Sequence, residues 1–157
     1  PGWTLVDRTD QKILDVLQRA GRIPVIELAG QVGISATPCH RRLKQLESGG
    51  IITGYAARID LERYGLSVNA FVNVKLRQST DSAMRKFESK IQALDEVIEC
   101  YLVSGRQDYV LSVVSRSLKT YEQFIRHELT NIEEVSSVES IFAFGQVKKL
   151  SSLPKMV

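Results

Sequence analysis

A short segment near the N-terminus gathers side chains that could bind a polyanion. These basic and hydrogen-bonding residues are Thr37, His40, Arg41, Arg42, Lys44 and Gln45. Arginine and lysine donate hydrogen bonds to guanine edges and to phosphates, whereas glutamine and threonine can reach other base edges. The chemistry indicated is recognition of a nucleic acid, provided that the chain presents these side chains together on one face.

Local signals predict three helices that would position this segment within residues 1–60. The first helix would start at Asp7, with Asp10 in a capping box, and stop at Gly21. The second would start at Pro24 and stop at Gly33. The third would start at Ser35, with Pro38 in its first turn, and stop at Gly49. Only Gly33, Ile34 and Ser35 separate the second helix from the third. Such a short connection predicts a helix-turn-helix.

The third helix is expected to have two different faces. Cys39, Leu43 and Leu46 recur at helical spacing and should be buried. The opposite side would carry Thr37, Arg41, Lys44 and Gln45, with His40 at its edge. Such a face fits the major groove of DNA. Arg41 and Lys44, with Thr37 and His40 nearby, are predicted to contact the groove, and Ser35 and Arg42 to meet phosphates.

Residues 51–59 (IITGYAARI) are predicted to form a short strand, or wing, against the helices. Tyr55 and Arg58 are its candidate phosphate contacts. Residues 60–66 would then link to a second domain, so that residues 51–66 form the wing and the linker strand. The predicted boundaries are therefore residues 1–60 for a winged helix-turn-helix and residues 67–157 for the second domain.

The second half of the chain is patterned as β-α-β-β-α-β. The predicted strands are residues 68–76, 97–104, 109–115 and 135–150, with helices beginning near Asp81 or Ser82 and spanning 117–132. This order indicates a ferredoxin-like sandwich, with two helices on one face of an antiparallel sheet. The overall fold class is α+β.

The other face of that sheet should also be covered. Strand 97–104 is apolar on both sides, with Tyr101 and Val103 on one parity and Ile98 and Leu102 on the other. Phe71 lies among the polar positions of its strand. An antiparallel sheet that faces water alternates more cleanly. We therefore expect a second copy of the chain to cover this face and form a homodimer.

Composition excludes several classes of protein. The 157 residues are 43% hydrophobic and 25% charged, as in an ordinary globular protein, and the net charge of +3 is too small to establish nucleic-acid binding by itself. No apolar run approaches the roughly 18–20 residues needed to span a membrane, and the first residues resemble no signal peptide. Two cysteines give no disulfide framework, so a cytoplasmic protein is expected.

No catalytic or metal site is expected either. Cys39 and His40 are adjacent on a helix and would point about 100° apart, so they form no nucleophile–base pair. His40 and His127 lack further residues at ligand spacing. No cofactor is therefore predicted.

The chain closely resembles the Lrp/AsnC family of transcription regulators over nearly its whole length. The segments that carry the resemblance are GRIPVIELAGQVGIS, TPCHRRLKQLE and LVSGRQDY. The resemblance implies a DNA-binding winged helix-turn-helix and a second domain that forms dimers, often assembled as a tetramer of dimers. It also implies a small effector, commonly an amino acid, bound between dimers.

The resemblance places the effector against one loop, formed by Ser104, Gly105, Arg106, Gln107, Asp108 and Tyr109. Gly105 would allow a tight turn with exposed amides, and Asp108 could accept an α-ammonium group. Many members have an acidic and an aromatic residue where this chain has Arg106 and Gln107. Arg106 could favour an acidic or polar effector, or pair with Asp108 and close the site.

The competing function is an amino-acid-sensing module that regulates an enzyme. The candidate reading helix argues against it.

Overall fold

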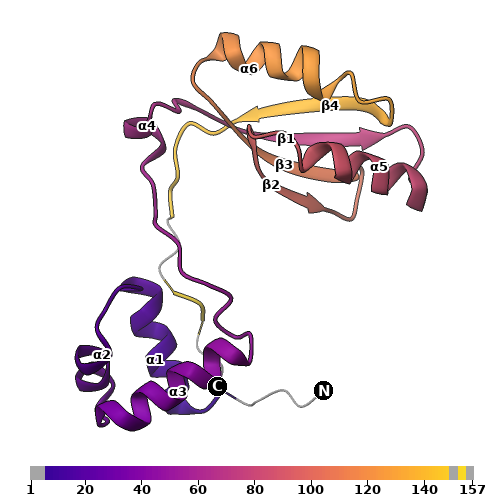
Figure 1. Ribbon diagram of the computed structural model, residues 1–157. Coiled ribbons are helices and arrows are strands. Elements are labelled where there is room, and N and C mark those ends of the chain that lie inside the picture. Colours follow the sequence, from indigo (N-terminus) through magenta and orange to yellow (C-terminus); the bar gives the residue numbers. More distant parts are fainter. Residues whose placement is uncertain (1–5, 149–151, 155–157) are drawn as a thin grey trace. The chain divides into compact units, whose positions relative to one another are not determined.

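The computed structural model describes residues 6–148 and 152–154 (Figure 1). The chain divides into two compact units, one of residues 1–58 and 147–157 and one of residues 59–146. We call them the head and the sheet domain. The sequence assigned residues 147–157 to the second domain; the described residues of this stretch, 147–148 and 152–154, group with the head.

Three helices form the head: α1 (Arg8–Arg19), α2 (Val25–Val32) and α3 (Ala36–Ser48). The predicted capping box is confirmed, because the Asp7 side chain accepts from the Asp10 amide at 2.8 Å and the Asp10 side chain accepts from the Asp7 amide at 3.2 Å. Gly33 has φ 81°, a left-handed conformation that favours glycine and allows α3 to begin three residues later.

The interior of the head is apolar. Its buried residues, drawn from all three helices, are Ile13, Val16, Leu28, Ala29, Val32, Cys39 and Leu46. Ser35 lies at the N-cap of α3 as predicted, but its side chain makes no capping hydrogen bond. The hydroxyl therefore has no role in closing the helix end.

The predicted wing strand is wrong. Residues 51–59, all of them described, contain no strand and belong to no hydrogen-bonded ladder among the described residues. Side chains attach this segment to the helices instead: the Tyr55 hydroxyl donates to Glu47 at 2.8 Å, and Arg58 donates to the Gln18 carbonyl at 3.0 Å. The predicted linker contains a short helix, α4 (Leu61–Tyr64).

The sheet domain has the predicted β-α-β-β-α-β order. Its elements are β1 (Val68–Leu76), α5 (Asp81–Ile91), β2 (Val97–Leu102), β3 (Tyr109–Ser115), α6 (Leu118–Phe124), a π-helical turn η1 (Ile125–Leu129) and β4 (Val135–Phe142). The strands pair antiparallel in the order β2-β3-β1-β4. Thr80 caps α5 in place of the predicted Asp81 or Ser82. β4 ends at Phe142, not at residue 150, and predicted residues 149–150 lie outside the described residues.

One face of the sheet carries the core. Alternate β1 residues such as Val72 and Val74 are fully buried against Phe87 of α5 and Leu129 of η1. The opposite face, which we call the open face, has no helix packed on it among the described residues and leaves Phe71, Tyr101 and Ile141 about half exposed. The predicted contrast between a helix-covered face and an uncovered apolar face is therefore present.

Candidate nucleic-acid interface and effector loop

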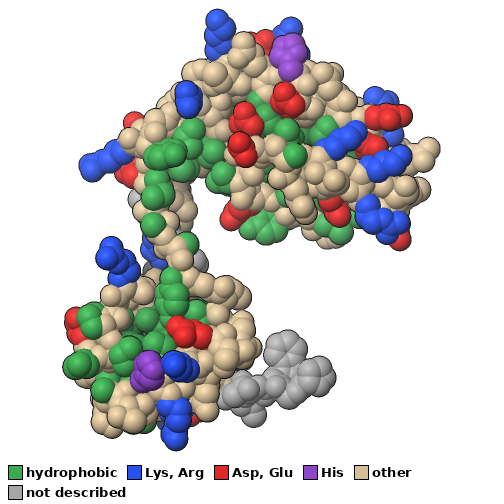
Figure 2. All heavy atoms as spheres, viewed as in Figure 1, with side chains coloured by type: hydrophobic (Ala, Val, Ile, Leu, Met, Phe, Trp, Pro, Cys, Tyr) green, Lys and Arg blue, Asp and Glu red, His purple; other side chains and the backbone are tan. Residues whose placement is uncertain are grey.

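The outward face of α3 presents the predicted set of polar side chains. Thr37, His40, Arg41, Lys44 and Gln45 are all exposed, whereas Cys39 and Leu46 on the inner face are buried. Figure 2 shows basic side chains beside a histidine at the surface of the head. Ser35 is exposed at the start of this helix, and Pro38 is half-buried. We call the exposed residues the reading face.

Arg42 does not belong to the reading face. Its guanidinium lies 2.6 Å from an Asp7 carboxylate oxygen and 2.9 Å from an Asp10 oxygen. Both carboxylates belong to the capping box of α1, so Arg42 fixes the start of α1 against α3. The phosphate contact predicted for Arg42 is therefore replaced by ion pairs within the head.

The electrostatics at this junction follow from the same contacts. A hydrogen bond from the Asp10 amide, reinforced by Arg42, lowers the pKa of the Asp7 carboxyl, and the two carboxylates raise the pKa of Arg42. This pairing could not be predicted from local sequence patterns, because Arg42 follows Asp7 by 35 positions.

The predicted effector loop joins β2 to β3. Gly105 has φ 119°, so the tight turn expected at this glycine is present. Ser104, Gly105 and Arg106 are exposed, and Gln107 is half-buried. The tip of the loop can therefore meet a ligand through its backbone and through the side chains of Ser104 and Arg106.

Asp108, unlike the exposed residues at the tip of the loop, has a side chain that is largely buried and hydrogen-bonded. Its carboxylate accepts hydrogen bonds from the Leu76 amide at 2.8 Å, from Lys75 Nζ at 3.1 Å and from Ser79 Oγ at 3.0 Å. The side chain is only 14% exposed. Its three donors all come from the end of β1 and the residues that follow, so Asp108 joins the loop to that end of the sheet.

The pKa of Asp108 reflects this environment. Burial alone would raise it, but the hydrogen bonds from Leu76, Lys75 and Ser79 outweigh burial and lower the pKa. The carboxylate is thus held ionised and already has three donors, and its ion-pair partner is Lys75 and not Arg106. Sequence reasoning missed Lys75 and Ser79, because they precede Asp108 by 33 and 29 residues.

Tyr109 is buried, with 1% of its surface exposed. Its ring packs on Phe87 with centroids 4.6 Å apart, and its hydroxyl donates to Glu88 at 2.8 Å. Burial, with Glu88 beside it, raises the pKa of the phenol. Tyr109 therefore belongs to the core beneath the helices and cannot reach a ligand at the loop, so its predicted contact with the effector must be corrected.

Other kinds of site find no support in the described part of the chain. No group of three or more His, Cys, Asp or Glu residues there could hold a metal ion. Cys39 is a buried thiol whose pKa is raised by burial, which suits a structural role and not a nucleophilic one. Among the helices of the described residues, none has the length and apolar character needed to cross a membrane.

Two family models together cover most of the chain. A model of the Lrp/AsnC ligand binding domain matches residues 69–153, and a model of winged helix-turn-helix DNA-binding domains matches residues 6–53. The chain belongs to the Lrp/AsnC family. The sheet domain is thus its ligand-binding domain, and the head is its DNA-binding domain.

Relatives of this Lrp/AsnC protein match it over more than nine-tenths of its length. The leucine-responsive regulatory protein of Rhizobium meliloti (strain 1021) is 38% identical over 91% of this chain and 92% of the relative. The Bkd operon transcriptional regulator of Pseudomonas aeruginosa is 38% identical over 95% of this chain and 97% of the relative. A transcriptional regulator of Neisseria meningitidis, solved with L-methionine, has a TM-score of 0.90 at 35% identity and covers 94% of this chain and 96% of its own.

These matches extend over both domains of the Lrp/AsnC protein. The protein is therefore a DNA-binding transcription regulator with a ligand-binding domain, and the family is one of regulators and not of enzymes.

Proposed function

We propose that this regulator binds double-stranded DNA by placing α3 in the major groove. The observation that carries the proposal is the reading face, a set of exposed donors on the last helix of a three-helix head. Arg41, Lys44 and Gln45 reach base edges, and Thr37 and His40 lie beside them. Ser35 and Pro38 begin the helix near a phosphate, where the Ser35 hydroxyl is not used for capping.

The proposed assembly is a homodimer formed through the open face of the sheet. Its apolar side chains come from three strands: Phe71 on β1, Tyr101 on β2 and Ile141 on β4. Exposed apolar side chains spread over several strands of one sheet face mark an interface, and a second copy of the same chain offers a matching surface. Two heads would then read half-sites about one helical turn or a multiple apart. Further association into a tetramer of dimers is part of the proposal.

The proposed effector is an amino acid bound at residues 104–107, between dimers. The Neisseria meningitidis relative was solved as an L-methionine complex, which supports this class of ligand. Backbone amides around Gly105 can bind the carboxylate. Arg106 is exposed and is not the partner of Asp108, which favours a direct contact between Arg106 and the effector. Asp108 then positions the loop. A regulator acting on DNA in this way works in the cytoplasm.

Quantitative DNA binding tests the proposal. Sites selected from random duplexes give the target, and fluorescence anisotropy measures affinity. Arg41→Ala should weaken specific binding by about 1–3 kcal/mol, roughly 5- to 150-fold, if it reads a base. Arg22→Ala is the matched control, because Arg22 is also exposed on the head but lies outside α3. Equal losses for the two variants would contradict the assignment of α3 as the reading helix.

A further inference from the structure

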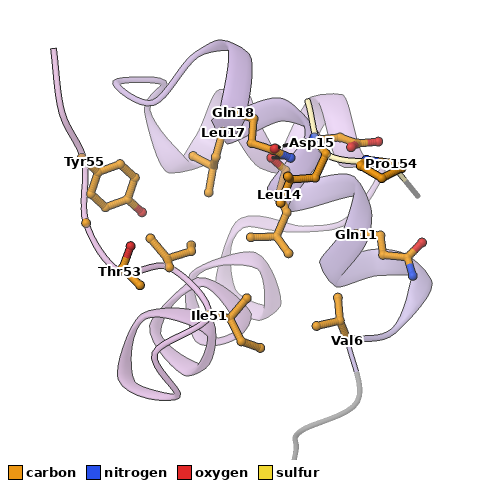
Figure 3. A pocket seen from close by; sticks show the side chains of 13 residues that line it. Val6, Gln11, Leu14, Asp15, Leu17, Gln18, Ile51, Thr53, Tyr55 and Pro154 are labelled. Carbon is orange, nitrogen blue, oxygen red and sulfur yellow. Dashed lines mark hydrogen bonds between the residues drawn. The ribbon is translucent and has the colours of Figure 1, made fainter. Parts of the chain in front are cut away.

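The head contains an apolar groove that neither DNA reading nor effector binding uses. Its volume is about 410 Å³, and it lies between α1 and residues 51–55. Its apolar lining includes Val6, Leu14, Leu17, Ile51, Ile52 and Tyr55. Figure 3 shows the side chains of α1 on one side of the groove and those of Thr53 and Tyr55 on the other.

Residues 152–154, which we call the C-terminal segment, reach this groove. Leu153 and Pro154 form part of its lining, and Pro154 lies beside α1 in Figure 3. The Leu153 amide donates to the Gln18 side-chain oxygen at 2.8 Å. The Gln18 side chain is itself held in place, because its nitrogen donates to the Leu14 carbonyl at 3.2 Å. The groove thus has an oriented acceptor for this segment next to an apolar surface.

We propose that the groove is the docking site for the protein's own C-terminal segment, with Leu153 as the apolar contact and Gln18 as the polar one. The observed contacts join two parts of a single chain, which identifies the occupant as this segment and not a separate partner. Docking makes the head a composite of both ends of the chain. The ligand-binding domain is then joined to the head by two chain segments instead of one.

Hydrogen exchange read by mass spectrometry on the full-length protein tests the docking. Leu153→Asp places a charge against the groove, and Val147→Asp is the matched control, because Val147 is fully exposed and precedes this segment. Leu153 is 66% exposed, so only the part of its side chain that faces the groove lining is lost. Peptides covering residues 11–20 and 51–55 should therefore exchange only about two- to fivefold faster, and in Leu153→Asp alone. Unchanged exchange in these peptides, or equal acceleration in both variants, would overturn the proposal.

A cross-linking experiment distinguishes the protein's own segment from that of a second copy. Thr53→Cys and Pro154→Cys, both in the groove lining, are combined with Cys100→Ser, since Cys100 is an exposed free thiol. A short bis-maleimide should join the two positions within one chain. A product of twice the chain mass would show another copy in the groove and overturn the proposal. Neither readout involves DNA, so failure of the docking and failure of the proposed DNA binding are separable.

Discussion

Replacing Asp108 by alanine separates a structural role of this residue from a ligand-binding role. The substitution removes the only carboxylate that the Leu76 amide, Lys75 and Ser79 share. Lys75 is 39% exposed and can return to water, but Leu76 is only 3% exposed, so its amide would lose its partner in a buried place. The variant should therefore be destabilised even when no effector is present.

The magnitude follows from these contacts. A buried donor left unpaired costs about 1–3 kcal/mol, and hydrogen bonds to charged groups are worth about 1.5–3 kcal/mol each. The ion pair with Lys75 is exposed and adds little, so it is left out of the sum. The free energy of unfolding should then fall by about 2–4 kcal/mol in Asp108→Ala. For a domain of this size, 2 kcal/mol lowers the melting temperature by about 8–16 °C.

Calorimetry at a fixed protein concentration measures this loss, since an oligomer melts at a concentration-dependent temperature. Asp81→Ala is the control, because Asp81 is highly exposed in the same domain and should matter little. Asp108→Asn, which keeps the shape and one acceptor, should lie between wild type and alanine. An Asp108→Ala variant that melts with the wild type but no longer responds to L-methionine or another amino acid would refute the reasoning and restore Asp108 as a ligand contact.

Other predictions concern acid stability, the head and the interface. The pKa values of Asp7 and Asp108 are lowered in the folded state, so the stability that these carboxylates contribute is complete above about pH 4 and is lost as the pH falls through the lowered values. Urea unfolding at about pH 3 and pH 6 measures this loss of stability. Asp108→Asn should reduce the difference in unfolding free energy between the two pH values. Arg42→Ala should lower the melting temperature of the head, whereas exposed Arg41→Ala should leave it nearly unchanged. Phe71→Asp should yield monomers in analytical ultracentrifugation, and an unchanged mass would contradict the proposed interface.

The helix-turn-helix was predictable because its signals are local. Asp7 with Asp10, Gly33 and the apolar spacing from Cys39 to Leu46 each act within one or two turns of helix, and the structure confirms them. The Arg42 ion pairs join helices far apart in sequence, and periodicity gives only the direction of a side chain, not its partner. The strand predicted at residues 51–59 is absent for a similar reason, since a strand needs a hydrogen-bonded partner that a local pattern does not reveal.

The error at Tyr109 could have been avoided from the sequence alone. Successive residues of a strand point to opposite faces, and Tyr109 shares its parity with the apolar residues Leu111 and Val113, which the structure buries in the core. Asp108 and Tyr109 therefore could not both face one ligand. The donors to Asp108 were out of reach, because only the folded sheet brings the end of β1 beside the loop.

The position of the loop on β1 bears on how an effector could influence the head. Both chain segments that lead to the head leave the sheet from the other end of β1: the linker before Val68, and the residues after β4, where the Ala143 amide donates to the Asn69 carbonyl at 3.0 Å. Asp108 binds the opposite end, at Leu76. β1 is nine residues long and hydrogen-bonded to β3 on one side and to β4 on the other, so we expect it to be too rigid to carry a signal between its ends. An effector at the loop therefore acts most directly on whatever lies against it, which supports regulation through contacts between dimers over a signal passed along a single chain.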